Sequence, residues 1–257
     1  MTPVALTIAS VDSSSGAGIT RDLSVFGDMG VYGMSCTCSV TSQNSCGVNR
    51  IFQVAPGIIG NQIDCILKDV APGAVKIGMF YSLRAGTVIE QRIKKYGLRN
   101  IVLDTPRISK NTRPIITDRA FRFLKNRLLP MADVITPNAE EAEALTGLHI
   151  CDTAGSREVC RILFDMGAKN IIVKGGHLDT PTDILYDGSN YFEVPGEPCD
   201  RRVHGTGCTF SAALCAGLAL GKSMPEAFAD AKQYVNEQII RSKRFGKTDL
   251  YYFVQGV

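Results

Sequence analysis

Short runs of apolar, often β-branched residues alternate along the chain with stretches whose apolar residues recur at helical spacing. The first run, Val4–Ala9, has the length of one strand, and apolar positions in Ile19–Met29 then follow a helical period. The same alternation predicts further strands at Met34–Ser42, Ala74–Gly78, Asn100–Asp104, Asp133–Thr136 and Asn170–Lys174. Helices are predicted at Ile58–Val70, Leu83–Tyr96, Asp118–Leu129, Ala139–Leu145, Thr153–Met166, Thr206–Leu220 and Pro225–Ile240, with Asp118 as an N-cap.

Alternating strands and helices predict an α/β fold with a central, mostly parallel sheet and helices on both faces. Asp187 and Gly188 separate two short strand-like runs, Asp183–Tyr186 and Tyr191–Val194, which indicates a hairpin and an antiparallel edge. In an open α/β sheet, ligands bind beyond the carboxyl ends of the strands. We therefore look for the functional residues in the loops after the predicted strands, which carry polar side chains or glycines.

The composition is that of a folded protein: 45% of the 257 residues are hydrophobic and 21% are charged. The net charge of +3 arises from mixed signs, so we expect no nucleic acid and no membrane among its partners. No apolar run approaches the ~18–20 residues of a membrane span, and the segment from Met1 to Ala9 does not resemble a signal peptide. One domain over residues 1–257 is expected, because no linker or repeat interrupts the pattern.

Nine cysteines, an odd number, argue against a secreted disulfide framework. Cys36 and Cys38 form C-x-C, which is not the spacing of redox or zinc sites. We interpret most of the cysteines as small apolar residues in a reducing compartment, and we expect a cytoplasmic protein.

The strongest local motif is His204–Thr209, with the sequence HGTGCT directly before an apolar helix. Two glycines around Thr206 let successive backbone N–H groups converge, and the helix N-terminus adds partial positive charge. Such a loop suits a phosphoryl group, and it would lower the pKa of Cys208 by stabilising its thiolate. On these residues alone, an ordinary helix entry with a buried cysteine is an equal alternative.

Two other phosphate motifs are absent or incomplete. The chain has no G-x-x-x-x-G-K-[ST] sequence. Gly16 and Gly18 begin a G-x-G-x-x-G pattern, but Arg21 occupies the place of the third glycine. A dinucleotide site is therefore weakly supported.

The HGTGCT motif resembles the loop of the hydroxymethylpyrimidine and phosphomethylpyrimidine kinases of thiamin biosynthesis, which belong to the ribokinase superfamily. The resemblance extends through most of the chain in matching order. It covers Ala5–Asp22 (ALTIASVDSSSGAGITRD), Val31–Met34 with Thr41–Asn44, Ala74–Met79 (AVKIGM), Val134–Gly147 (VITPNAEEAEALTG), Val173–His177 (VKGGH) and Ala216–Gly221. It implies a ribokinase-like fold with a small β lid, and a kinase that uses ATP with Mg²⁺.

The resemblance also implies roles for single residues. Cys208 would be the catalytic base that takes the proton of a substrate hydroxyl, where the wider superfamily typically has an aspartate. Backbone N–H groups of Gly205, Thr206, Gly207 and Cys208 would stabilise the transferred phosphoryl group. Lys174, Asn138 and Gly207 would bind ATP, and Glu141 and Asp104 would handle the metal shell, Glu141 mainly through bound water.

On the substrate side the resemblance points to Asp22, Gln43, Met79, Thr41 and Ser10. An aminopyrimidine offers ring nitrogens and an amine, so one amide and one carboxylate could read its edge. The chain departs from the family at two places. Ser10 replaces a glycine close to the substrate, and Asp104-Thr105-Pro106-Arg107 replaces the usual Asp-Pro-Val-Met.

We therefore expect a kinase for 4-amino-5-hydroxymethyl-2-methylpyrimidine, its monophosphate, or both. A pyridoxal or pyridoxine kinase with the same fold and the same cysteine is the nearest alternative, and a non-catalytic ligand-binding homologue is a second. The family further suggests a homodimer, with the Met34–Ser42 region forming part of a lid or interface.

Overall fold

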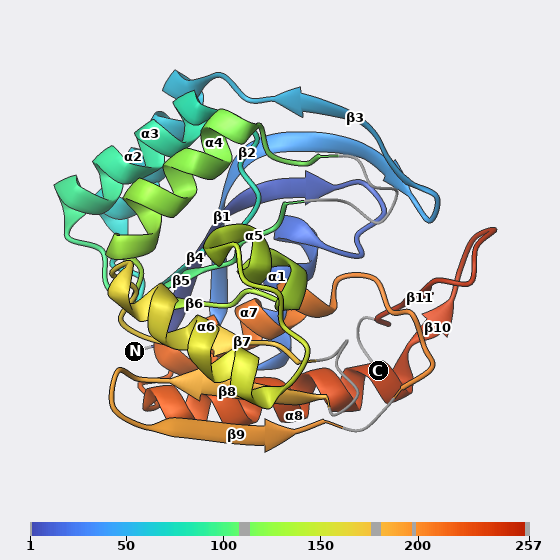
Figure 1. Cartoon of the computed structure of the whole chain (residues 1–257). Helices are drawn as coiled ribbons and strands as arrows, with labels where there is room; N and C mark the ends of the chain where they lie inside the picture. Colours follow the sequence, from blue (N-terminus) through green and yellow to red (C-terminus); the bar gives the residue numbers. More distant parts are fainter. Residues whose placement is uncertain (1, 108–113, 176–180, 197–198, 255–257) are drawn as a thin grey trace.

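A computed structural model describes residues 2–107, 114–175, 181–196 and 199–254. Nine strands form one sheet in the order β3-β2-β1-β4-β5-β6-β7-β8-β9 (Figure 1). Their bounds are β1 Val4–Asp12, β2 Tyr32–Asn44, β3 Gly47–Gln53, β4 Ala74–Ile77, β5 Ile101–Leu103, β6 Val134–Ile135, β7 Ile171–Val173, β8 Thr182–Tyr186 and β9 Tyr191–Pro195. Neighbours from β2 to β7 pair in parallel, while β3, β8 and β9 pair antiparallel at the two edges.

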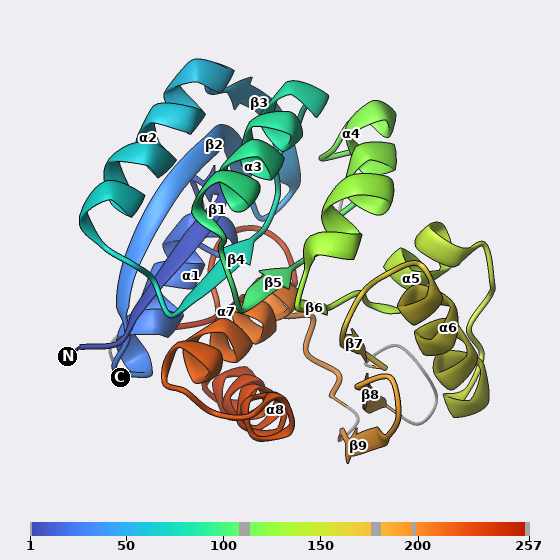
Figure 2. The ribbon, with the colours of Figure 1, turned by 90° about the vertical axis from the view of Figure 1, so that its left-hand side faces the viewer.

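Helices cover both faces of this sheet, as the alternation predicts (Figure 2). One face packs against α2 (Pro56–Asp69), α3 (Leu83–Tyr96), α4 (Asp118–Phe123), α5 (Ala139–Thr146) and α6 (Thr153–Asp165). The other face packs against α1 (Gly18–Asp28), α7 (Thr206–Ala219) and α8 (Met224–Arg241). Residues Thr209 to Leu218 of α7 are buried throughout, which is why this helix is apolar on every side. Among the described residues, no helix combines the length and the apolar character needed to cross a membrane.

One edge of the sheet, the β8–β9 hairpin, was predicted from the sequence, and the opposite edge, strand β3, was not. The hairpin of β8 and β9 confirms the antiparallel edge around Asp187 and Gly188. On the opposite edge, β3 was not expected, because GVNRIFQ is largely exposed and lacks a regular apolar alternation. Strands β1 and β2 also run longer than predicted, and the β2–β3 hairpin extends beyond the sheet body as the small β lid that the resemblance implies (Figure 1).

The predicted helix at Asp118–Leu129 begins at Asp118, but the predicted N-cap and the regular α-helical course were wrong. Thr117, not Asp118, is the N-cap, since its Oγ accepts a hydrogen bond from the N–H of Ala120 at 3.3 Å. After Phe123 the helix continues as a π turn over Leu124–Leu128 and a 3₁₀ turn over Leu129–Met131, where Pro130 ends it. Gly176 and His177 of the VKGGH match lie outside the described residues.

Candidate active site

A cavity of about 170 Å³ opens at the carboxyl ends of β1, β2 and β4. Four of the five predicted substrate residues line it: Ser10, Thr41, Gln43 and Met79. It is smaller than the ~300–1,000 Å³ of sites for drug-sized ligands, so it suits a small molecule. Lys76, His204 and Cys208 line the same space, although the first two were not predicted as site residues.

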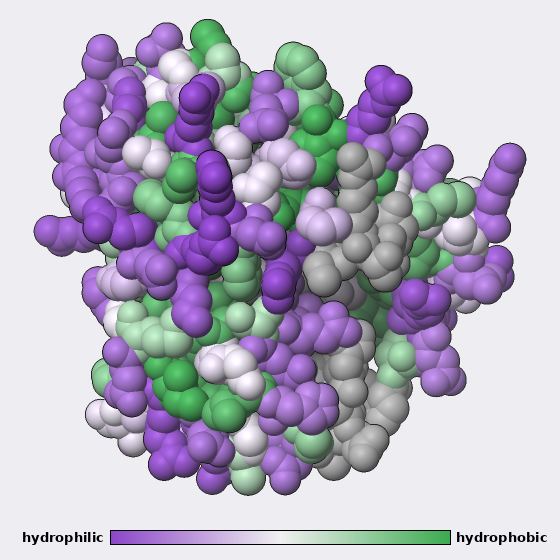
Figure 3. All heavy atoms as spheres, turned by 45° about the horizontal axis from the view of Figure 1, so that its top comes forward, coloured by the Kyte–Doolittle hydropathy of each residue, from purple (hydrophilic) through white to green (hydrophobic). Residues whose placement is uncertain are grey.

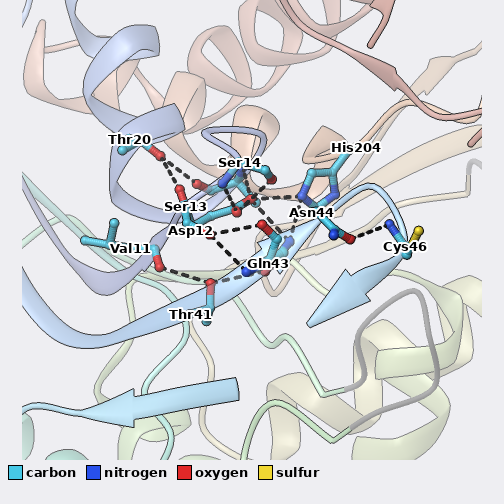
Figure 4. A network of polar contacts seen from close by, with 11 residues as sticks. Val11, Asp12, Ser13, Ser14, Thr20, Thr41, Gln43, Asn44, Cys46 and His204 are labelled. Atoms are coloured by element: carbon cyan, nitrogen blue, oxygen red, sulfur yellow. Dashed lines mark hydrogen bonds and ion pairs between the residues drawn. The ribbon is translucent and has the colours of Figure 1, made fainter. Parts of the chain in front are cut away.

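Three polar side chains from distant segments converge on one wall of the cavity (Figure 4). Asp12, at the end of β1, accepts hydrogen bonds from His204 Nε2 at 2.9 Å and from Gln43 Nε2 at 3.2 Å. Gln43 Nε2 also lies 2.9 Å from His204 Nε2. Burial works to raise the pKa of Asp12, but hydrogen bonds from His204 and Ser14 outweigh it and hold that pKa below its usual range. Asp12 is therefore a charged anchor that orients Gln43 and His204.

Ser10, the residue that replaces a family glycine, is 3% exposed and already has protein partners. Its hydroxyl donates to the carbonyl oxygen of Met79 at 2.9 Å and pairs with the hydroxyl of Ser39 on β2. The side chain therefore occupies space at the cavity wall and satisfies one backbone acceptor there.

Asp22 does not reach the cavity, contrary to the sequence prediction. Its carboxylate is fully buried on α1, forms an ion pair with Lys76 and accepts a hydrogen bond from Thr7 Oγ at 2.7 Å. Lys76 is the member of this pair that faces the cavity. Burial works to lower the pKa of Lys76, but the Asp22 carboxylate outweighs it and raises that pKa, so the amine stays charged. The sequence prediction placed Asp22 in the substrate site because no local pattern indicates that Asp22 pairs with Lys76 inside the core.

The loop before α7 has the geometry that the HGTGCT motif predicts. Gly205 is the N-cap with φ of +82°, and a Cβ atom there would lie 1.8 Å from the carbonyl oxygen of Gly16. A Cβ on Gly207 would lie 3.3 Å from Lys174 Nζ. Both glycines thus permit close approach, and the N–H groups of Thr206, Gly207 and Cys208 lie in the first turn of α7, where they have no intrahelical acceptor.

The protonation of Cys208 differs from the expectation of a lowered pKa. Burial raises the pKa of this thiol to about 11, although the Lys76 charge and the Gly18 N–H work in the opposite direction. The carboxylates of Asp104 and Asp22 add to the rise. The dipole of α7 was expected to dominate, but desolvation and two nearby negative charges exceed it.

The residues predicted for ATP and metal gather in a second cluster at the ends of β5, β6 and β7. Lys174 Nζ lies 3.7 Å from Asp104 Oδ1, and Asp104 also accepts a hydrogen bond from Thr136 Oγ at 3.2 Å. Asn138 and Glu141 form a capping box at the start of α5. We call Asp104, Asn138, Glu141 and Lys174 the acidic–lysine cluster. Cys208 joins it to the cavity, since its Sγ lies 3.9 Å from Asp104 Oδ2.

The donor set of this cluster suits a hard divalent cation. Burial, together with the charge of Asp104, raises the pKa of Glu141 to about 7, although Lys174 works to lower it. Two carboxylates that repel each other in a desolvated place favour a cation between them, and Mg²⁺ prefers oxygen ligands. Among the described residues, no group of three or more His, Cys, Asp or Glu side chains is placed to hold a metal ion.

The fold and these two adjoining sites define a class of protein. A mostly parallel α/β sheet carries a glycine-lined helix N-terminus, and a small-molecule cavity meets a charged cluster at the Cys208 thiol. This arrangement suits a phosphotransferase. A family model described as phosphomethylpyrimidine kinase matches residues 12–252. The chain belongs to this family, and it is therefore a kinase with the ribokinase-like fold.

Individual relatives agree with this assignment. The chain is 37% identical over 239 residues to a hydroxymethylpyrimidine/phosphomethylpyrimidine kinase of Bacillus subtilis, covering 91% of this chain and 88% of that one. It is 38% identical over 245 residues to a thiamine biosynthesis bifunctional protein of Geobacter sulfurreducens, covering 94% of this chain. It spans only half the length of that bifunctional protein.

Two solved structures are similar over nearly the whole chain. A phosphomethylpyrimidine kinase of Clostridium difficile is 37% identical, with a TM-score of 0.84 and coverage of 92% of this chain and 99% of that chain. An ADP complex of Bacillus subtilis pyridoxal kinase is 30% identical, with a TM-score of 0.91 and coverage of 99% and 98%. The higher sequence identity thus falls on the pyrimidine kinase, and the higher structural similarity on the pyridoxal kinase.

Proposed function

We propose that the chain transfers the γ-phosphoryl group of ATP to the hydroxymethyl group of 4-amino-5-hydroxymethyl-2-methylpyrimidine, to its monophosphate, or to both. One observation carries the proposal. Cys208 lies where the small-molecule cavity meets the acidic–lysine cluster, so a substrate hydroxyl and a nucleotide phosphate would meet at its sulfur.

In this reaction the hydroxyl oxygen of the alcohol forms a bond to the γ-phosphorus, and the bond from that phosphorus to the β–γ bridging oxygen breaks. Cys208 takes the hydroxyl proton as the base. The N–H groups of Thr206, Gly207 and Cys208, together with Lys174, would stabilise the negative charge on the transferred group. Gln43, held by Asp12, would read the edge of the ring through its amide.

ATP and Mg²⁺ are part of the same proposal. Asp104 and Glu141 would hold the cation, which neutralises phosphate charge when bound. Asn138 and Lys174 lie beside these carboxylates, and the parallel bridge between them fixes their relative position.

The experiment is phosphorylation by the purified protein with ATP and MgCl₂, read by mass spectrometry of the product. We expect one added phosphate on hydroxymethylpyrimidine, and a diphosphate if the monophosphate is also a substrate. Failure to phosphorylate either compound, with ADP formation at background, would refute the proposal.

Pyridoxal phosphorylation is the second candidate, favoured by the TM-score of 0.91 with a pyridoxal kinase. Equal amounts of hydroxymethylpyrimidine and pyridoxal in one reaction give the ratio of their kcat/KM values directly. We expect the pyrimidine product to dominate, and a dominant pyridoxal phosphate product would reverse the assignment. Ligand binding without turnover on either alcohol would instead support the non-catalytic homologue.

We also propose that the protein is a cytoplasmic homodimer that joins through its β2–β3 edge. Val40 on β2 and Phe52 on β3 face each other across the strands and are 41% and 74% exposed. An exposed cross-strand apolar pair on an edge hairpin is a typical contact surface.

A further inference from the structure

A buried ion pair lies outside both the cavity and the acidic–lysine cluster. Asp183 on β8 and Lys232 on α8 are 2.9 Å apart, with side chains 4% and 11% exposed. The second carboxylate oxygen of Asp183 accepts a hydrogen bond from the backbone N–H of Gly175 at 2.9 Å. Both oxygens of Asp183 are therefore used inside the protein.

Gly175 directly follows Lys174, whose amine approaches the first turn of α7. On the other side, the N–H of Lys174 donates to the carbonyl oxygen of Pro137 at 2.9 Å, next to the capped start of α5. The main chain at Lys174 is thus tied to α5 through Pro137 and to β8 through Asp183. A Cβ atom on Gly175 would lie 2.1 Å from the carbonyl oxygen of Thr182, so the chain passes β8 too closely for any side chain.

Stability alone does not account for this arrangement. A buried ion pair recovers little more than its desolvation cost, and apolar residues of similar volume are often as stable. What a carboxylate adds is a strong, directed acceptor for one backbone N–H, because charged hydrogen bonds are shorter and about twice as strong as neutral ones. Lys232 holds that carboxylate in place through the ion pair of 2.9 Å.

We propose that Asp183 and Lys232 are positioning residues that hold Lys174 against the nucleotide phosphates by anchoring Gly175. The proposal rests on the proposed kinase function, because it takes Lys174 as a phosphate ligand. Neither residue touches a reactant. Their effect reaches the site through the main chain of Gly175 and Lys174, and a displaced cation loses much of its interaction with a phosphoryl group.

The test compares two double variants that both remove the buried charges. Asp183→Asn with Lys232→Met keeps an oxygen acceptor for the Gly175 N–H, whereas Asp183→Leu with Lys232→Met removes it. We expect the leucine pair to raise the KM for ATP and the Kd for ADP in MgCl₂ by about tenfold. The asparagine pair keeps a neutral and therefore weaker acceptor, so we expect it to raise these values by only about threefold, and the KM for the alcohol should be unchanged in both.

An exposed pair, Lys222 and Asp230, supplies the control. Lys222→Met with Asp230→Leu is expected to leave the KM for ATP unchanged. If the leucine pair does not fold, Asp183→Ala with Lys232→Met replaces it, because water can then reach the Gly175 N–H. We expect the same rise in the KM for ATP and the Kd for ADP.

Unchanged ADP binding in the folded leucine or alanine pair would overturn the proposal, as would equal weakening in the asparagine pair. Measuring ADP binding also lets failure of this proposal be distinguished from failure of the proposed kinase function. A wild-type protein that binds ADP but phosphorylates no alcohol refutes the function, and the variants then still decide the role of Asp183.

Discussion

Cys208 is a protonated thiol at neutral pH, because burial and the neighbouring carboxylates raise its pKa to about 11. Lys76 is the buried cation whose charge opposes this rise. A base with such a high pKa is strong once deprotonated but scarce, since only about 10⁻⁴ of it is thiolate at pH 7. Above pH 8, where Glu141 with its pKa of about 7 is already charged, the pH dependence of the reaction should therefore report on this side chain.

We predict that kcat/KM rises by roughly tenfold per pH unit between pH 8 and pH 10 if the thiolate is the base. The rise reflects deprotonation of Cys208 below its raised pKa. Steady-state rates over this range, with alkylation of the Cys208 peptide followed by mass spectrometry, measure the rate and the thiolate fraction together. A flat rate profile beside a rising thiolate fraction would exclude the thiolate as base.

A substitution that removes the charge of Glu141 should raise both the free energy of unfolding at alkaline pH and the Mg²⁺ concentration that the reaction requires. Its pKa is raised to about 7, so its charged form destabilises the folded chain above the ordinary carboxyl range. Glutamine also completes a capping box with Asn138 and carries no charge. We predict that Glu141→Gln unfolds with about the same free energy as wild type near pH 5 and is ~1–3 kcal/mol more stable at pH 8.5.

Denaturant unfolding without divalent ions at the two pH values measures this effect. The same variant should need a higher Mg²⁺ concentration for half-maximal rate, because it lacks one carboxylate. A variant less stable than wild type at pH 8.5 would show that the charged Glu141 is favourable in the fold.

At the scale of elements, the loop that enters α7 depends on two close backbone approaches. Gly205 and Gly221 have nearly equal φ values, +82° and +83°, one before α7 and one after it. They differ in space: a Cβ at Gly205 meets Gly16, whereas a Cβ at Gly221 has nothing within 4 Å. The two glycines therefore share nearly the same φ and differ in the space around a Cβ atom.

We predict that Gly221→Ala costs only ~1–2 kcal/mol of stability, from the left-handed backbone, and leaves kcat within about twofold. Gly205→Ala should cost more and should lower kcat by about 10²-fold or more, because the N–H groups of the loop lose their alignment. Thermal unfolding and steady-state assays on both variants provide the comparison. Equal effects at the two positions would mean that the close approach to Gly16 does not matter.

At the scale of the whole molecule, the strand and helix order was predictable because buried parallel strands are short apolar runs between amphipathic helices. Strand β3 was not, since its residues are mostly exposed. In the site, the glycine loop could be located from local sequence, and Gln43 from the resemblance to the kinase family. The convergence of Asp12 with His204, 192 residues apart, and the burial of Asp22 against Lys76 depend on tertiary packing that no local pattern records.

Exposed hydrophobic side chains are candidates for the contact between two copies of the chain. On the face shown in Figure 3, such side chains reach the surface in several separate groups among hydrophilic ones. We predict that Phe52→Glu shifts the protein from dimer to monomer, because a charge opposite Val40 opposes burial of the hairpin edge. Light scattering after size-exclusion chromatography measures the mass, with Ile240→Glu on α8 as control, because Ile240 is 73% exposed and Phe52 is 74% exposed. A wild-type monomer, or a dimer unaffected by Phe52→Glu, would contradict the interface.

The most direct test of the central claim is transfer of label from γ-³²P-ATP to hydroxymethylpyrimidine by wild type and Cys208→Ala. The account predicts labelled pyrimidine phosphate with wild type and a rate lower by about 10²–10⁴-fold with the variant. Both proteins should bind the unphosphorylated alcohol with similar affinity. An alanine variant that transfers label at the wild-type rate, or a wild type that transfers none, would contradict the account.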